Sequence, residues 1–361
     1  MNNKEWESLK KYLPCDWEEK AKELGALIRR REIKSADELL ALNLLHVTDG
    51  GSYQATSEMM KLTAGISLDK NAVYKRIKSS WKWLKYLSRE VCQSKGMMIP
   101  RPNFLGDRHV LLTDGSEISL VGSKTSDYRL HYDFDLFDFQ CRNIEITATK
   151  EGEKLSRHEI KSNDIVIADR IYCTIKGIEH VVASEAGYVL RFKSKAFSLY
   201  DKEGKKLELL PLFRSLKALK NTDVHCFYKL AGELRPIRIV AMKKDNQAAE
   251  KAKGKMIKKA IRKNEKVATD ETMEFNEYIV LATNLDYTNK QILELYRARW
   301  QIEQVFFRLK SMFGFGEIPN KNPDSVMAWF YAKLLLASLC EAVVRTECFS
   351  PSEQQLLFGS D

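Results

Sequence analysis

The chain of 361 residues lacks the motifs of several large enzyme classes. It has no G-x-S-x-G, no P-loop, no G-x-G-x-x-G and no pair of histidines at the spacing of a zinc site. Its seven cysteines are scattered, odd in number and never spaced as C-x2-C, which argues against a disulfide framework and against structural zinc. The N-terminal stretch MNNKEWESLKKYL has no apolar signal core. We therefore expect a cytoplasmic protein.

Long uncharged apolar runs are also missing. The most apolar stretch, 325–344, contains Lys333 and Glu341, so it predicts a buried helix and no membrane span. What the chain does have is positive charge, with 59 Lys and Arg against 49 Asp and Glu and a net charge of +10. That excess favours an anionic partner, either nucleic acid or a membrane surface.

Residues 1–98 have the pattern of helices. Within them, the stretch 52–87 predicts two helices joined by a turn at 63–67, with Ser67 or Asp69 as the N-cap of the second helix. The second helix is predicted to expose the cations Lys70, Lys75, Arg76, Lys78, Lys82 and Lys85 and to bury Val73, Ile77, Trp81 and Leu84. This pattern fits a helix-turn-helix in the major groove and, equally well, an ordinary helical hairpin with solvated lysines.

After the proline-marked linker MMIPRPNF (97–104) the pattern changes to short apolar runs typical of strands. The runs are HVLLTDG (109–115), YRLHYDFDLFDF (128–139), NIEITATK (143–150), DIVIADR (164–170), YVLRFK (188–193), FSLYD (197–201), LELLPLF (207–213), VHCFYKL (224–230), IRIVAMK (237–243) and EYIVLATNL (277–285). The runs between about 181 and 240 predict a β-rich subdomain with turns at Gly204 and Gly232. Residues 243–266 hold ten Lys and Arg and three acids, which predicts a basic helix or a mobile arm, with a solvated face as the default interpretation.

Two of these runs, VLLTD and IVIAD, consist of about four apolar residues followed by an acid. Such runs are typical of strands covered on both faces, so we expect Asp114 and Asp169 at the ends of buried strands, with Gly115 turning the chain away. Taken alone, each aspartate is more readily explained as a turn residue at the end of a strand.

A third group lies in YRARWQIEQVFFRLK (296–310), predicted as part of one helix that begins at Thr288 or Asn289. At about 100° per residue, Tyr296, Arg299, Glu303 and Lys310 project from one stripe about 60° wide. A neighbouring apolar stripe is predicted to be buried and consists of Leu295, Ile302, Phe306, Leu309 and Phe313. Taken alone, this is also the pattern of a solvated edge beside a core face.

Asp114, Asp169 and Glu303 together provide three carboxylates, two on strands and one on a helix. Hard divalent cations take oxygen ligands, and two Mg²⁺ ions about 4 Å apart can activate a nucleophile and stabilise the leaving oxygen of a phosphodiester. The three acids therefore indicate a metal-dependent phosphoryl-transfer site.

These residues resemble the DDE transposases of the insertion-sequence-four family. The resemblance rests on Asp114, Asp169 and the Y-x2-R-x3-E-x6-K spacing of Tyr296, Arg299, Glu303 and Lys310. It extends to DIVIADRIY around the second aspartate and to the N-terminal helical stretch, and it covers most of residues 1–315. It implies an α/β fold with a ribonuclease-H-like core.

The resemblance also implies the domain organisation. A helical DNA-binding domain would occupy 1–98 and a catalytic domain 99–345, with a β-rich insertion at about 181–278 and a C-terminal tail at 346–361. The sequence extends about fifty residues past Lys310, so a larger C-terminal dimerisation module is expected to be reduced or absent.

By the same resemblance, Asp114, Asp169 and Glu303 would bind two Mg²⁺ ions, which Mn²⁺ can replace, while Tyr296, Arg299 and Lys310 hold DNA beside the cut phosphate. Tyr278 would be the aromatic residue that stacks on a flipped base. The partners would be double-stranded DNA, at the inverted-repeat ends of the element and at the target, and a second copy of the chain, without a membrane. The site of action would be the bacterial cytoplasm, on nucleoid DNA.

The implied reaction is cut-and-paste transposition by hydrolysis and strand transfer through a hairpin intermediate. Alternatives are a metal-dependent nuclease on the same core, a domesticated DNA-binding protein and a non-catalytic basic scaffold. Arg170 and His180, near the second aspartate, fit either catalytic helpers or surface charge.

Overall fold

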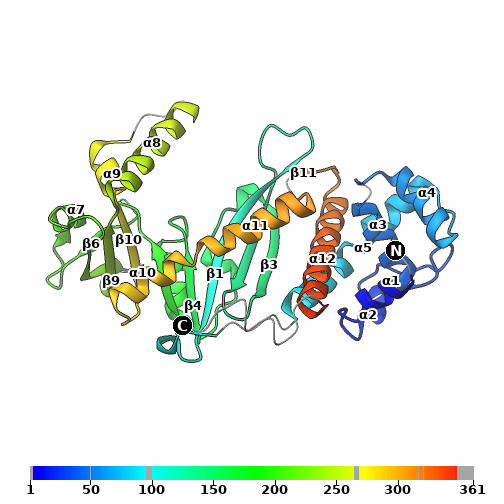
Figure 1. The fold of residues 1–361 in the computed structure, drawn as a ribbon, viewed down its shortest axis with the longest axis horizontal. Helices are drawn as coiled ribbons and strands as arrows, with labels where there is room; N and C mark the ends of the chain where they lie inside the picture. Colours follow the sequence, from blue (N-terminus) through cyan, green and yellow to red (C-terminus); the bar gives the residue numbers. More distant parts are fainter. Residues whose placement is uncertain are drawn as a thin grey trace. The chain divides into compact units, whose positions relative to one another are not determined.

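The computed structural model describes residues 3–48, 50–94, 100–194, 196–263, 268–315, 317–319 and 321–347 (Figure 1). The chain forms two compact units. The first comprises residues 1–99, 115–151 and 303–361, and the second comprises 100–114 and 152–302. The division falls within strand β1 (His109–Leu120) and helix α11 (Trp300–Phe313), so both elements contribute to both units.

The described strands belong to a large mixed sheet accompanied by helices, which confirms the α/β class. The two compact units differ from the predicted domains. The predicted division into a DNA-binding and a catalytic domain is one of function and stays a prediction.

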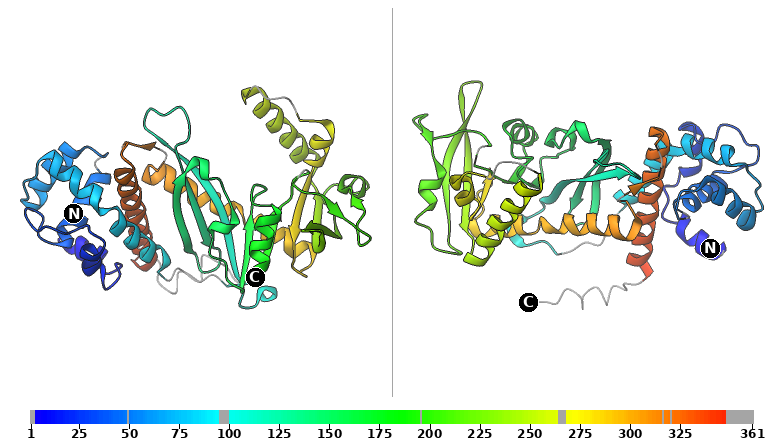
Figure 2. Two further views of the ribbon diagram at one scale, coloured as in Figure 1. Left: turned by 180° about the vertical axis from the view of Figure 1, so that it is seen from behind. Right: turned by 90° about the horizontal axis from the view of Figure 1, so that it is seen from above.

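Helices dominate the first unit. Before residue 95 the described helices are α1 (Asn3–Lys10), α2 (Trp17–Glu23), α3 (Ala36–Thr48), α4 (Tyr53–Ala64) and α5 (Lys70–Gln93). The long helix α12 (Pro323–Glu347) packs along α5 and also contacts α3. In both views of Figure 2, α12 (red) lies beside the cyan end of α5. Residues 346 and 347 of the predicted tail belong to α12, and the rest of the tail lies outside the described residues.

Among the described helices, α12 is the one whose length and composition would suit a membrane span. Its segment Pro323–Val343 has a mean hydropathy of 1.5, but 67% of that window is buried inside the protein. Val326, Leu335 and Leu339 are among the side chains it buries. Its apolar surface is therefore accounted for by the core of the first unit.

The predicted pair of helices at 52–87 is confirmed as α4 and α5. Gly65 ends α4 with a φ of +67°, a conformation that glycine adopts without strain, and the Asp69 side chain caps α5 by accepting hydrogen bonds from the amides of Asn71 and Ala72. The predicted apolar stripe is wrong at one position. Trp83 is fully buried and donates to the Trp17 carbonyl (2.8 Å), whereas Trp81 is only half-buried.

Only half of the six cations predicted to be solvated on α5 are exposed. Lys78 pairs with Asp324 (3.8 Å), the Lys85 ammonium lies 6.0 Å from the centre of the Tyr331 ring, and Arg76 donates to the Arg29 carbonyl (2.7 Å). Lys70, Lys75 and Lys82 are exposed. The packing of α12 on α5 explains the first two contacts, because Asp324 and Tyr331 are residues of α12.

The strands of the first unit are the last part of β1, β2 (Tyr128–Asp135) and β3 (Gln140–Ala148), with β2 and β3 antiparallel. The short strand β11 (Glu317–Ile318) runs parallel to the end of β1.

In the second unit, β1, β4 (Asp164–Ala168) and β5 (Gly187–Arg191) are parallel, and α6 (Ile175–Ala183) connects the last two. The remaining strands follow antiparallel beyond β5, in the order β10 (Tyr278–Thr283), β9 (Glu233–Lys243), β8 (Asn221–Leu230), β6 (Leu199–Tyr200) and β7 (Lys206–Leu207). The predicted β-rich segment thus continues the sheet of its own unit, since β10 pairs with both β5 and β9.

One predicted strand is wrong. The run LELLPLF contains helix α7 (Leu209–Phe213), whose Leu209, Leu210 and Phe213 are buried. Its apolar residues at spacings of one, three and four fit a single helical turn, a pattern that a short run cannot separate from a strand. The predicted turns are confirmed, because Gly204 and Gly232 have φ values of +79° and +90°.

His46 is the most strongly perturbed histidine of the first unit. It is 1% exposed and stacks on Tyr53, with ring centres 4.8 Å apart. The Thr56 hydroxyl donates to the Ser52 carbonyl (2.7 Å), so it must accept from His46 Nδ1 (2.9 Å), and Nε2 carries the lone pair without a hydrogen-bond partner. Burial therefore lowers the pKa of His46 to about 4.

This pKa predicts acid sensitivity. Because the folded-state pKa lies below the usual 6.5, the unfolded chain binds more protons between pH 6.5 and 4, and stability falls across that window by up to about 3 kcal/mol. A His46→Phe variant should lose less stability than the wild type between pH 7 and pH 4.5, as measured by urea unfolding. The exposed His225→Gln serves as the control. An equal loss of stability in His46→Phe and in the wild type would show that protonation of His46 is not the cause of the acid sensitivity.

Candidate active site

Parallel pairing of β1 and β4 places the two predicted aspartates side by side. The strands pair in register from His109 with Asp164 to Thr113 with Ala168. Asp114, on β1, and Asp169, directly after β4, are the next residues beyond this pairing, so they lie at adjacent positions. Both side chains are accessible, with 19% and 41% exposed.

Asp169 directly follows β4, as predicted. Asp114 does not end its strand, however, because β1 continues to Leu120 and Gly115 makes no turn. The pairing of β1 with β4 ends just before Asp114, whereas β1 itself continues into the first unit. The sequence pattern indicated that the fully buried part of the strand ends here, but it did not indicate that the strand continues to Leu120.

Tyr296 and Arg299 lie next to these aspartates. The Tyr296 hydroxyl is 3.5 Å from Oδ1 of Asp169, and Nη1 of Arg299 is 3.5 Å from Oδ2 of Asp114. Both distances are long for hydrogen bonds, so they record proximity and electrostatic attraction more than tight bonding. The second unit therefore brings together four of the seven residues in the predicted site.

The predicted single helix is wrong. Helix α10 (Asn289–Arg297) ends before Arg299, and α11 begins at Trp300. Around this junction the amides of Arg299, Gln301 and Ile302 bond to carbonyls three residues back, which tightens the backbone into a 3₁₀-like turn. The 100° spacing does not apply through this turn, and the angular argument for one stripe does not hold. The buried side of the pattern is confirmed for Leu295, Ile302, Phe306 and Leu309, while the side chain of Phe313 is outside the described part of the chain.

The start of α10 is fixed by a polar network centred on Arg238 of β9. Arg238 donates to Asp223 (2.9 Å), to the carbonyls of Leu285 (3.1 Å) and Tyr287 (2.6 Å), and to the side chain of Asn289 (2.5 Å). Asn289 in turn donates to Asp223 (3.1 Å). Burial opposes ionisation of Asp223, but the hydrogen bonds from Asn289 and Arg238 outweigh it and lower its pKa. Thr288 and Gln291 complete a capping box.

Arg191 is a site residue that the sequence analysis did not find. Ala168 pairs with Leu190, so Arg191 of β5 occupies the position next to Asp169. It is 8% exposed, donates to the Tyr278 carbonyl (2.8 Å) and lies 6.0 Å from the centre of the Tyr296 ring, which has Arg299 at 5.9 Å. The sequence signal for Arg191 was its position inside the apolar run YVLRFK, because burying a charged side chain in a strand is costly unless the charge has a partner.

The surroundings of Arg191 are electropositive. Burial, together with Arg170 and Arg299, lowers the pKa of Arg191 to about 10. Burial and the charges of Arg191 and Arg170 lower the pKa of Lys244 to about 8. Both side chains remain mostly protonated at pH 7. Arg170 thus belongs to this positive region, whereas His180 contacts the carbonyl of His158 (3.1 Å).

Glu303 and Lys310 are exposed residues of α11 that belong to the first unit. Their predicted roles stay predictions. Tyr278 is 2% exposed, and its ring packs against Phe213 with centres 5.6 Å apart. That packing gives Tyr278 a structural role in the core and presents no ring face for a base in this conformation.

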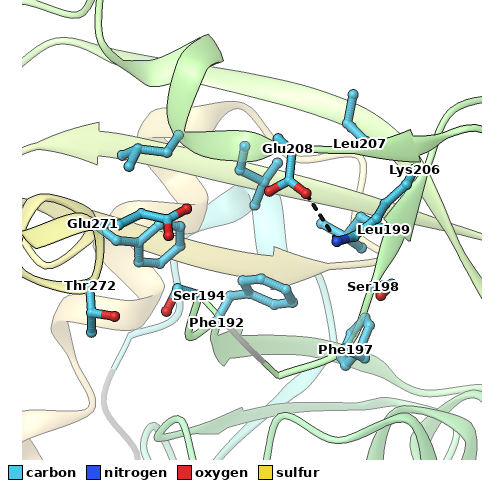
Figure 3. A pocket seen from close by; sticks show the side chains of 13 residues that line it. Phe192, Ser194, Phe197, Ser198, Leu199, Lys206, Leu207, Glu208, Glu271 and Thr272 are labelled. Carbon is cyan, nitrogen blue, oxygen red and sulfur yellow. Dashed lines mark ion pairs between the residues drawn. The ribbon is translucent and has the colours of Figure 1, made fainter. Parts of the chain in front are cut away.

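A cavity of about 440 Å³ lies in the second unit, between β6, β7, α7 and α9 (Asp270–Phe275) (Figure 3). Phe192 and Phe197 contribute aromatic walls, and Lys206 and Glu208 form an ion pair (3.1 Å) at its edge. None of the predicted site residues lines it.

The donor set of the site suits a divalent cation. Asp114 and Asp169 present carboxylate oxygens from neighbouring strands, which is the ligand type that Mg²⁺ and Mn²⁺ prefer. The nearby Arg191, Arg299 and Lys244 suit an anionic substrate. An acidic pair beside several cations can hold a phosphate next to a metal ion.

Comparison with known proteins shows similarity to transposases of insertion sequences. A family model described as the transposase DDE domain matches residues 110–339. The chain is 28% identical to the InsL protein of insertion sequence element IS186A of Escherichia coli K12 over 341 residues, which cover 92% of this chain and 91% of the relative. It is also 28% identical to the transposase of IS421 of Escherichia coli over 342 residues, with the same coverage. The transposase of IS1151 of Clostridium perfringens is 22% identical over 244 residues, 61% of this chain and 51% of that protein.

The Arg238 network generates a prediction. Arg238→Lys keeps the charge but cannot serve four acceptors, so it should lower the free energy of unfolding by about 2–3 kcal/mol. Arg235→Lys is the matched control, because Arg235 is on the same strand in an exposed pair with Glu233 (2.9 Å) and should cost under about 0.5 kcal/mol. Chemical denaturation measures both. Equal costs for the two variants would show that the network does not stabilise the start of α10.

Proposed function

Because the chain belongs to the transposase DDE-domain family, we propose that it catalyses cut-and-paste transposition of an insertion sequence. It cuts double-stranded DNA at the inverted-repeat ends of the element and joins the freed ends to target DNA, in the cytoplasm of a bacterial cell. The observation that supports this most strongly is the adjacency of Asp114 and Asp169 on parallel strands, with Tyr296 and Arg299 beside them.

Asp114, Asp169 and Glu303 are the residues that would hold two Mg²⁺ ions. Glu303 is included because of the resemblance of its Y-x2-R-x3-E-x6-K signature to that of the insertion-sequence-four transposases. When bound, such ions supply Lewis-acid stabilisation of the attacking and leaving oxygens of a phosphodiester.

The protein side chains do the remaining work. Arg299 and Lys310 hold backbone phosphate by charge-assisted contacts, and Tyr296 donates a neutral hydrogen bond. Arg191, next to Asp169, and Lys244, close to Arg191, add positive charge that attracts the scissile phosphate. Arg238 has a positioning role, because it fixes the start of α10 and thereby the positions of Tyr296 and Arg299.

The reaction follows in four displacements at phosphorus. Water attacks the phosphate at an element end, and the broken P–O bond leaves a 3′-hydroxyl. That hydroxyl attacks the opposite strand to form a hairpin and free the flanking DNA. A second water opens the hairpin and restores the 3′-hydroxyl, which then attacks a phosphate of the target strand. Each step exchanges one P–O bond for another and transfers one proton to the leaving oxygen.

Recognition of the element ends is assigned to residues 1–98. Helices α4 and α5 with the turn at Gly65 support this assignment, and Lys70, Lys75 and Lys82 are the cations that α5 leaves exposed. A homodimer would hold both ends of the element at once. The stacking of a flipped base is assigned to Tyr278, whose ring would leave the core to reach the base.

Isosteric variants test the carboxylates. Asp114→Asn and Asp169→Asn should each lower the rate of end cleavage by about 10³-fold or more, since several kcal/mol of transition-state stabilisation are lost, while binding of end DNA is retained. Chelation of divalent ions should reproduce the loss. Asp286→Asn, at an exposed loop position, is the control.

Analysis of the products decides between the functions. Hairpin and strand-transfer products support the transposase, and nicks or breaks alone would reduce the protein to a metal-dependent nuclease. Near-normal cleavage by either variant would remove that aspartate from the site.

A further inference from the structure

Helix α8 (Asn246–Lys263) carries a row of four cations on one side. Lys251, Lys255, Lys258 and Arg262 follow one another at offsets of zero, four, seven and eleven, which places them within about 60° around the helix axis. All four side chains are exposed. The row extends about 16 Å along the helix.

The opposite side of α8 holds the helix to its own unit. Ala249 and Ala260 are buried there, and Lys253 pairs with Glu250 (3.3 Å) and Glu277 (2.8 Å). The Asp245 side chain accepts from the Ala248 amide (2.8 Å) and so caps the first turn. Among the described elements, none packs extensively along α8, and Figure 1 shows it beside α9 at the edge of the second unit. The cationic row therefore faces solvent.

This row is not neutralised within the helix. Glu250 is the single acid of α8, and it is already paired with Lys253. Like charges at spacings of three and four residues destabilise a helix, and the row contains three such pairs. A polyanion that binds the row removes this repulsion.

We propose that the cationic row of α8 binds the phosphate backbone of duplex DNA without regard to sequence. The inference rests on the proposed function, in which the protein must hold DNA beyond the scissile phosphate. Duplex DNA carries one charge per about 1.7 Å of its axis, so a 16 Å row of flexible cations can meet several phosphates at once. The exposed Ile257 and Ile261 flank the row, but two isoleucines are too small an apolar face for a membrane-surface helix.

The test compares two variants of the full chain with the same change in charge. In the row variant, Lys251, Lys255, Lys258 and Arg262 are changed to Gln. In the control variant, the exposed Lys202, Lys205, Lys217 and Lys220 of the same unit are changed to Gln. Affinity for a 30-base-pair duplex without element ends is measured by fluorescence anisotropy between about 50 and 200 mM salt, in EDTA so that no cleavage occurs.

The row variant should bind at least about tenfold more weakly at low salt, and its log–log salt slope should fall by about three, one unit per phosphate lost. The control should change less than twofold. A charge-conserving variant, with the three lysines changed to Arg and Arg262→Lys, should bind like the wild type, which separates charge from folding.

Equal binding by the row and control variants would overturn the proposal. So would binding of the wild type to anionic phospholipid vesicles that is lost with the row while DNA binding is kept. Because the assay needs no cleavage, failure here leaves the catalytic proposal untouched. Absence of cleavage by a chain whose row still binds DNA would fault the catalytic proposal alone.

Discussion

The in-register parallel pairing of β1 with β4 is the constraint on which the rest of the site depends. Strands of a sheet lie about 4.8 Å apart, so two carboxylates at neighbouring positions are close enough to share a cation. The pairing ends at Thr113 and Ala168, and the two aspartates follow at once. On the next strand, β5, Arg191 lies beside Asp169. The register of the three strands therefore places two acids next to a buried guanidinium.

The second constraint is the position of α10. A helix can carry Tyr296 and Arg299 to the aspartates only if its start is fixed, and Arg238 provides this by joining β8, β9, the loop at 285–287 and Asn289. The network lies on the antiparallel strands that continue the sheet beyond β5. The β-rich segment between the second aspartate and the helix is therefore part of the support of the site.

Much of the fold could be predicted from the sequence because burial leaves a pattern in single strands and helices. The runs around Asp114 and Asp169, the N-cap Asp69 and the basic helix at 246–263 are local features of this kind. The features that could not be predicted depend on contacts between residues that are distant in the sequence. The continuation of β1 past Gly115, the burial of Trp83 instead of Trp81 and the position of Arg191 beside Asp169 are set by pairing and packing. The 3₁₀-like turn around Trp300 is local, but the apolar residues keep a helical spacing in the sequence across it, so the sequence gives no signal of the break.

The central claim is that Asp114 and Asp169 act through a shared divalent cation, and a change of metal preference tests it most directly. Replacing Asp169 with Cys puts a soft thiolate where a hard oxygen ligand is expected, and Mg²⁺ accepts sulfur poorly whereas Mn²⁺ tolerates it better. End cleavage by Asp169→Cys should be measured side by side in Mg²⁺ and in Mn²⁺. The account predicts loss of cleavage in Mg²⁺ and substantial recovery in Mn²⁺, with no such switch in the wild type. Equal activity of the variant in the two metals, or equal loss without recovery, would contradict direct coordination by this carboxylate.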